Sequence, residues 1–216
     1  MWEERVAPLS GLGFVVLFAT GVVIMGYYDF MPEPGQVVSF YSESPARLMT
    51  GAYVGMLGSV FLLWFAGSLR RSIRSRADGT ERLAVIAFGG TVFAAVMVVL
   101  GLVAISYPAE RVMIHGSIDP GAAIALFDLS SGLLGSALAI GLAAAVGGYG
   151  LAQLRDAKTP AWLAWVNLVL ALGLVSPVNW AVIALGILWL PVVSVSMYRR
   201  ARADAVVAPE TELVGR

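Results

Sequence analysis

Long apolar stretches without charged side chains constrain the fold of this chain more than any other feature. The stretch from Leu83 to Tyr107, for example, contains no Asp, Glu, Lys or Arg. A helix needs about 20 apolar residues to cross the roughly 30 Å hydrocarbon core of a bilayer. The composition agrees, since 59% of the residues are hydrophobic and only 13% are charged, against about a quarter charged in soluble domains. We therefore expect helices that cross a membrane.

Six segments are long and apolar enough to be such helices, so the predicted fold class is all-α, a polytopic integral membrane bundle of six transmembrane helices in one domain over residues 1–200. Prolines mark several boundaries: Asp119-Pro120 is a typical helix start, Pro108 is expected to stop the third helix, and Pro177 separates the last two. Residues 201–216 are expected to form a polar, disordered tail. The predicted helices are about 9–27, 45–69, 83–107, 120–154, 160–176 and 179–198.

The distribution of Lys and Arg predicts the orientation. With the N-terminus inside, twelve of the fourteen Lys and Arg residues fall in cytoplasmic segments, and only Arg47 and Arg111 fall outside. Cytoplasmic loops carry such an excess, so both termini are expected to be cytoplasmic (N-in/C-in). No cleavable signal peptide is expected. The preference for Arg over Lys, with much Ala, Val and Gly, suggests a bacterial protein of the plasma (inner) membrane.

The first outer segment leaves two alternatives open. Residues 35–42 could form a short interfacial helix, with Val37, Val38, Phe40 and Tyr41 against the lipid headgroups. An ordered loop with its aromatic side chains at the interface is equally compatible with the sequence.

Asp128 is the one acidic residue inside a predicted membrane helix. At about 1.5 Å per residue it lies roughly 13 Å beyond the Asp119 cap, where a carboxylate costs about 2.5–3.5 kcal/mol. We therefore expect it to face the bundle interior, on a stripe of small residues that includes Ser131, and to pair with Arg47. The first interpretation is a connection between two helices through Arg47 or a Tyr or Trp donor, and the alternative is a protonatable or ligand-binding acid in an outward-facing pocket.

The remaining polar and aromatic residues are expected to support the bundle. Asn167 and Asn179 are predicted to hydrogen-bond between helices, or alternatively to line a cavity. The GxxxG of residues 51–55 and the small residues around Gly141 are typical of close helix packing. The tryptophans are expected in interfacial belts, namely Trp162, Trp165 and Trp180, with Trp64 and Trp189 as further candidates.

Several kinds of chemistry lack the residues they need. The chain has no Cys and one His, His115, so a metal site, a bis-histidine haem and an HExxH protease are disfavoured, and no cofactor is expected. The basic run RRSIRSR (70–76) is expected to fix topology and to touch anionic lipid. A formal net charge of zero gives no basic surface for nucleic acid.

Five segments of the sequence resemble the DUF4386-like family of six-helix bacterial membrane proteins, a domain of unknown function. They are VVSFYSESPARL, SLRRSIRSR, AFGGTVFAA, DAKTPAWLAWVNLVLAL and WLPVVSVSMYRR. The resemblance implies the six-helix topology and no activity or binding residues.

Two functions follow as hypotheses. The first is non-enzymatic binding of a lipid, an apolar small molecule or a partner protein within the bilayer, with membrane lipids as partners and a second copy or another membrane protein as further candidates. The alternative is a small transporter in which Asp128 couples substrate to protons. A water-accessible pocket at Asp128 would favour transport, and a close pair with Arg47 would favour the first hypothesis.

Overall fold

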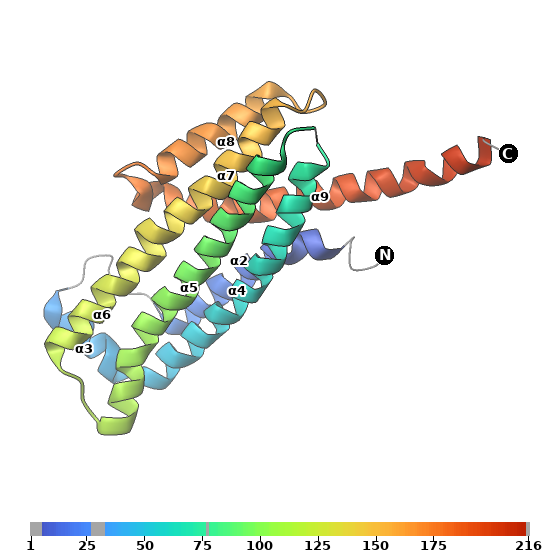
Figure 1. The fold of residues 1–216 in the computed structure, drawn as a ribbon. Coiled ribbons are helices and arrows are strands. Elements are labelled where there is room, and N and C mark those ends of the chain that lie inside the picture. The colour runs from blue at the N-terminus through green and yellow to red at the C-terminus, as the bar shows by residue number, and fades with distance from the viewer. Residues whose placement is uncertain (1–5, 27–32, 77, 215–216) are drawn as a thin grey trace.

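The computed structural model describes residues 6–26, 33–76 and 78–214, and over these ranges the chain is entirely helical apart from turns and short connections (Figure 1). A 3₁₀ turn, η1, precedes the first long helix, and a five-residue π-helix, η2, joins α6 to α7 in one continuous rod. The elements are η1 (Ala7–Leu9), α2 (Ser10–Met25), α3 (Pro34–Glu43), α4 (Pro45–Arg74), α5 (Glu81–His115), α6 (Pro120–Gly132), η2 (Leu133–Ala137), α7 (Leu138–Leu154), α8 (Ala161–Leu174) and α9 (Asn179–Val214).

Five helical segments of the described chain are long and apolar enough to cross a bilayer, and by this composition the protein is a multi-pass membrane protein. They are Ala7–Met25, Pro45–Arg74, Glu81–His115, Pro120–Leu154 and Asn179–Ala203. The sixth predicted segment is α8, which has 14 residues. At about 1.5 Å per residue it is roughly 21 Å long, shorter than the hydrocarbon core.

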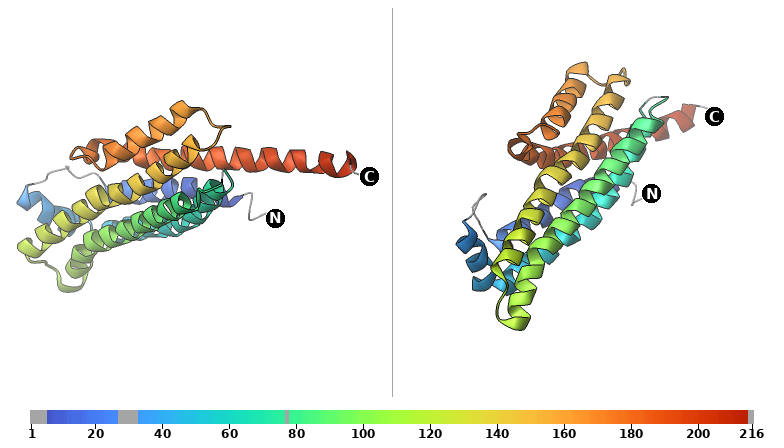
Figure 2. Two further views of the ribbon diagram at one scale, coloured as in Figure 1. Left: turned by 45° about the horizontal axis from the view of Figure 1, so that its top comes forward. Right: turned by 60° about the vertical axis from the view of Figure 1, so that its left-hand side comes forward.

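Helices α8 and α9 form a hairpin that lies beside only part of the bundle (Figures 1 and 2). A Cβ atom on Gly186 of α9 would touch Leu174 of α8 and Leu142 of α7, so the turn of the hairpin lies beside the middle of the α6–α7 rod. Farther along, α9 passes the start of α8, where the Arg200 guanidinium donates to the Thr159 hydroxyl at 3.2 Å. The hairpin therefore enters and leaves at the same end of the bundle.

Glycines set how closely the long helices approach. A Cβ on Gly90 of α5 would lie 2.6 Å from the carbonyl oxygen of Gly141 on α7, and a Cβ on Gly51 of α4 would lie 2.5 Å from that of Gly21 on α2. Both contacts are to backbone atoms, so no side chain can move aside to make room. The predicted role of Gly51 and Gly141 in helix packing is confirmed.

Three predicted boundaries are wrong. Helix α5 continues through Pro108 to His115, because one proline removes a single backbone hydrogen bond and both Pro108 and Ala109 are buried against neighbouring helices. Helix α4 extends to Arg74, five residues beyond its predicted end. Helix α9 continues to Val214, so the tail that was expected to be disordered is helical as far as this residue.

Residues 34–43 do form the short helix α3, which settles one open alternative, although its side chains do not point as predicted. Val37 and Tyr41 are 3% and 0% exposed and pack into the bundle rather than against headgroups. The Phe40 ring meets the Phe127 ring of α6 edge to face at 6.5 Å. Helix α3 therefore covers one end of the bundle.

The glycine contact between α5 and α7 predicts the effect of adding one methyl group. Gly90→Ala forces the methyl carbon against the Gly141 carbonyl, and such overpacking costs about 1–3 kcal/mol. Gly89→Ala is the matched control, because a Cβ there meets no atom within 4 Å and alanine is the better helix former by up to about 1 kcal/mol. Thermal unfolding in detergent should give Gly90→Ala a melting temperature below that of wild type, and Gly89→Ala a melting temperature equal to or above it. Equal melting temperatures for the two variants would contradict the close contact.

Candidate functional site

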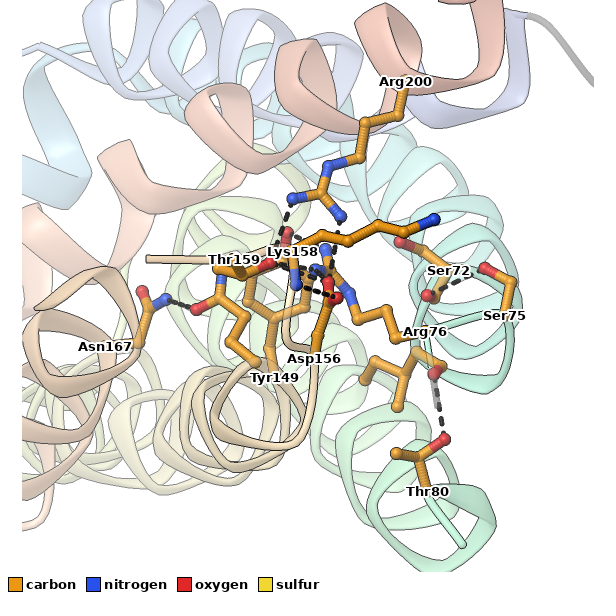
Figure 3. Close-up of polar contacts among 12 residues, drawn as sticks. Ser72, Ser75, Arg76, Thr80, Tyr149, Asp156, Lys158, Thr159, Asn167 and Arg200 are labelled. Atoms are coloured by element: carbon orange, nitrogen blue, oxygen red, sulfur yellow. Dashed lines mark hydrogen bonds and ion pairs between the residues drawn. The ribbon is translucent and has the colours of Figure 1, made fainter. Parts of the chain in front are cut away.

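A buried ion pair lies at the end of the bundle where α9 passes the loop that precedes α8 (Figure 3). Arg76 follows the last turn of α4, and Asp156 lies in the loop between α7 and α8. Their side chains are only 3% and 7% exposed, and Nη1 of Arg76 lies 3.3 Å from Oδ2 of Asp156. The other guanidinium nitrogen, Nη2, donates to the Tyr149 hydroxyl of α7 at 2.6 Å, and the guanidinium also lies 4.6 Å from the centre of the Tyr149 ring.

The Asp156 carboxylate is the acceptor on which the surrounding donors converge. The Thr159 hydroxyl donates to Oδ2 at 2.7 Å, the backbone N–H of Lys158 donates to Oδ1 at 3.0 Å, and Nη1 of Arg200 lies 3.6 Å from Oδ2. The cluster therefore joins the end of α4, the end of α7, the loop that follows it, and α9.

Burial and hydrogen bonding act in opposite directions on the ionisation of this pair. Burial alone would raise the pKa of Asp156, but the hydrogen bonds from Thr159 and Lys158 and the charges of Arg76 and Arg200 outweigh it and lower the pKa below its ordinary value. Burial lowers the pKa of Arg76 from its ordinary value. A depressed acid pKa stabilises the fold above the unfolded-state value of about 3.9, and this contribution is lost only as the pH falls through the folded pKa. The carboxylate is thus ionised throughout the neutral range.

A second buried polar chain lies beside the ion pair and joins the last three helices. The Asn167 amide of α8 donates to the Gln153 side-chain oxygen of α7 at 2.6 Å, and the Trp189 indole N–H of α9 donates to the Asn167 oxygen at 2.9 Å. Trp189 also meets the Tyr149 ring edge to face at 5.7 Å. Asn167 therefore makes the interhelical hydrogen bonds predicted for it.

A lateral groove of about 1240 Å³ opens next to the ion pair, between η1, the start of α2, α4 and α9. Along α4 and the turn after it, the wall changes from apolar at Phe61 and Trp64 to polar from Ser68 onward, and the polar part contains both members of the ion pair. The apolar lining includes Pro8, Leu9, Phe61, Leu63, Trp64 and Met197, and the polar lining includes Ser68, Arg71, Ser72, Ser75, Arg76, Asp156, Lys158 and Arg200.

Asp128 and Arg47 lie elsewhere, and their expected arrangement is not the one observed. Both residues are exposed, as is Ser131, and neither Asp128 nor Arg47 forms an ion pair with any residue that the structure describes. Measured from the other end, Asp128 lies about 39 Å from Leu154 along the rod, more than the thickness of the hydrocarbon core. The rod is therefore longer than the hydrocarbon core is thick, and depth counted from Asp119 alone does not fix the position of Asp128 in the membrane.

The basic run 70–76 is divided among different roles. Arg74 forms an exposed ion pair with Glu81 at 2.7 Å, and Arg70 approaches the same carboxylate at 3.6 Å. Arg76 turns into the bundle, and Arg71 lines the groove. The sequence signal for the buried pair is weak, since Asp156 is simply the acidic residue of a short loop followed three residues later by Thr159.

The other residues singled out from the sequence have separate positions. Asn179 is half-buried as the first residue of α9. Trp189 is only 7% exposed, so its expected place in an interfacial belt is wrong, whereas Trp64 is 62% exposed at the groove. His115 ends α5 in an exposed position. In the part of the chain that the structure describes, no group of three or more His, Asp or Glu residues could hold a metal ion.

No family model, curated protein or solved structure matches this chain. The resemblance to the DUF4386-like family stays a prediction carried by the five quoted segments.

The buried pair predicts a large effect of removing one charge. Asp156→Asn keeps the size of the side chain but leaves the Arg76 guanidinium buried without its counter-ion, which typically costs about 3–5 kcal/mol. The matched control is Glu81→Gln, which removes an acid that is 54% exposed and should change stability by less than about 1 kcal/mol. Thermal unfolding of the purified proteins at neutral pH distinguishes the two. A melting temperature of Asp156→Asn equal to that of Glu81→Gln would show that the pair does not hold this end together.

Proposed function

We propose that the protein binds an amphiphilic ligand, a lipid or a lipid-like small molecule, in the lateral groove and performs no chemistry on it. The observation that carries the proposal is the division of the groove wall. Trp64 and Leu63 are 62% and 45% exposed at its apolar part, while the polar part ends at the Arg76–Asp156 pair. A molecule with an apolar body and a polar head matches both parts.

The size and shape of the groove support the same ligand class. Pockets for drug-sized ligands are about 300–1,000 Å³, and this groove is larger. Along α4 the lining runs from Phe61 to Ser75, about 21 Å at 1.5 Å per residue. Gly67 lies between them and leaves open space, because a Cβ there would meet no atom within 4 Å.

Binding without catalysis is favoured by the chemistry of the lining. Its one described carboxylate, Asp156, is engaged by Arg76, Arg200 and Thr159. Among the described lining residues there is no histidine and no second carboxylate to act as a general base toward the serine hydroxyls.

For the topology we propose six crossings with both termini cytoplasmic, in a bacterial plasma membrane, with the bilayer thinned locally around the short helix α8. Val6 and Ala201 border the groove together with Arg76 and Asp156, so the beginning and end of the bundle share one end with the loops after α4 and α7. The Lys and Arg residues gather at this same end, which supports a cytoplasmic location.

Proton-coupled transport through Asp128 is the alternative. The lack of an ion pair between Asp128 and Arg47 agrees with it, but Asp128 is not part of the groove lining. Ligand binding at the Arg76 end is therefore the preferred proposal.

Single cysteines test the topology, since the chain has no native Cys. In intact cells a membrane-impermeant maleimide should label Ser117→Cys, in the exposed loop between α5 and α6, and should reach Asp78→Cys only after permeabilisation. Val178→Cys, in the α8–α9 turn and 55% exposed, should be labelled from outside if the hairpin crosses completely. Labelling of Ser117→Cys together with protection of Val178→Cys would show a hairpin that stops within the bilayer, and six crossings would be wrong.

Filling the groove tests ligand binding. Gly67→Leu should occupy the open space without a backbone clash and should abolish retention of lipid in native mass spectrometry of the detergent-purified protein. Gly89→Leu is the control, because Gly89 is equally open but is not a lining residue. Equal lipid retention by the two variants would refute binding in the groove.

A further inference from the structure

We propose that the polar part of the groove is a phosphate site, and that the ligand is an anionic phospholipid whose headgroup phosphate lies among Ser72, Arg76, Lys158 and Arg200. This inference rests on the proposed function and specifies the class of amphiphile. The shared chemistry is a phosphate group, and the apolar wall commits the site to a phosphate that carries acyl chains.

The first step is the charge of the lining. Its described residues carry four cationic side chains, Arg71, Arg76, Lys158 and Arg200, and one anionic side chain, that of Asp156. Arg71 has a contact of its own, but the three cations of the proposed site, Arg76, Lys158 and Arg200, still outnumber the one carboxylate and leave an excess of two positive charges. A neutral headgroup would leave this charge uncompensated, whereas an anionic headgroup compensates it.

The second step is the supply of hydrogen-bond donors. Nε of Arg76 is buried and has no hydrogen-bond partner among the described residues, although the rest of its guanidinium is engaged by Asp156, Thr159 and Tyr149. An arginine held in place by its other contacts is a preorganised donor for phosphate oxygens. Lys158 is exposed, and in Figure 3 its side chain extends toward the end of α4, where Ser72 lies.

The third step is the distance between the two parts of the groove. Trp64 and Ser72 are about two turns apart on α4, roughly 12 Å at 1.5 Å per residue. A phosphate at Ser72 would therefore place the beginning of the acyl chains along Gly67, Trp64 and Leu63. Free phosphate would use the donors and leave this exposed apolar wall uncovered, so the structure favours the lipid.

The experiment measures headgroup selectivity with matched lipids. Detergent-purified protein is titrated with 1-palmitoyl-2-oleoyl phosphatidylglycerol and with phosphatidylcholine of the same acyl chains, and binding is read by native mass spectrometry. We expect phosphatidylglycerol to bind at least about tenfold more tightly. Lys158→Gln should weaken the binding of phosphatidylglycerol by about fivefold, which is the effect of one Lys or Arg near an anionic lipid. The binding of phosphatidylcholine should be unchanged.

The matched control is Arg82→Gln, which removes an exposed arginine that follows Glu81 at the same end but is not a lining residue. It should leave the selectivity intact. An equal loss in Arg82→Gln and Lys158→Gln would mean general attraction between charges and would overturn the phosphate site.

The remaining outcomes separate this inference from the proposed function. Equal binding of both lipids, with loss of both in Gly67→Leu, overturns the phosphate site and leaves the amphiphile groove standing. Binding that is indifferent to Gly67→Leu overturns both. Competition by millimolar inorganic phosphate as effective as that by phosphatidylglycerol would assign the site to free phosphate and overturn the lipid.

Discussion

The buried Arg76–Asp156 pair is the interaction on which the arrangement of the α8–α9 hairpin and the groove depends. Two charges at 3% and 7% exposure carry a large desolvation cost, and a buried pair is often no more stabilising than a well-packed apolar contact. Its effect is on specificity, because the Asp156 carboxylate reaches both of its cationic partners only when the ends of α4 and α7 and the middle of α9 come together. The Tyr149 hydroxyl and the Thr159 hydroxyl complete the same set of contacts.

The groove follows from this arrangement. Arg76 is held at the end of the bundle, so α4 presents Arg71 and Ser72 near the ion pair and Trp64 about two turns farther from it. Helix α9 must pass over the ion pair for Arg200 to reach Asp156, and η1 packs alongside it. The buried charges at this end therefore form part of a surface that can recognise a charged ligand. Such buried, interacting charges are common at binding sites.

The amino-acid sequence predicts much of the fold and little of the candidate site. Helix length and the absence of charge predict the segments around α2, α4, α5 and α6–α7, and Asp119 does cap α6. The ends of the helices are less predictable, because a helix can continue through a proline such as Pro108 where the surrounding residues are buried. In the sequence, Asp128 is the exceptional acid because it lies within an apolar segment, yet it is exposed in the structure. Asp156 has the sequence context of an ordinary loop residue, yet it is buried against Arg76.

The sequence by itself determined that this chain forms long apolar helices with small residues at their contacts, because hydropathy and residue size are local properties that a pattern shows directly. Only the tertiary structure decided which charges are buried, that Trp189 faces inward to Asn167, and that a groove with an apolar and a cationic part lies beside Arg76. These features join residues about 80 positions apart, such as Arg76 and Asp156. Their proximity depends on how the helices cross, and no local pattern in the sequence encodes that.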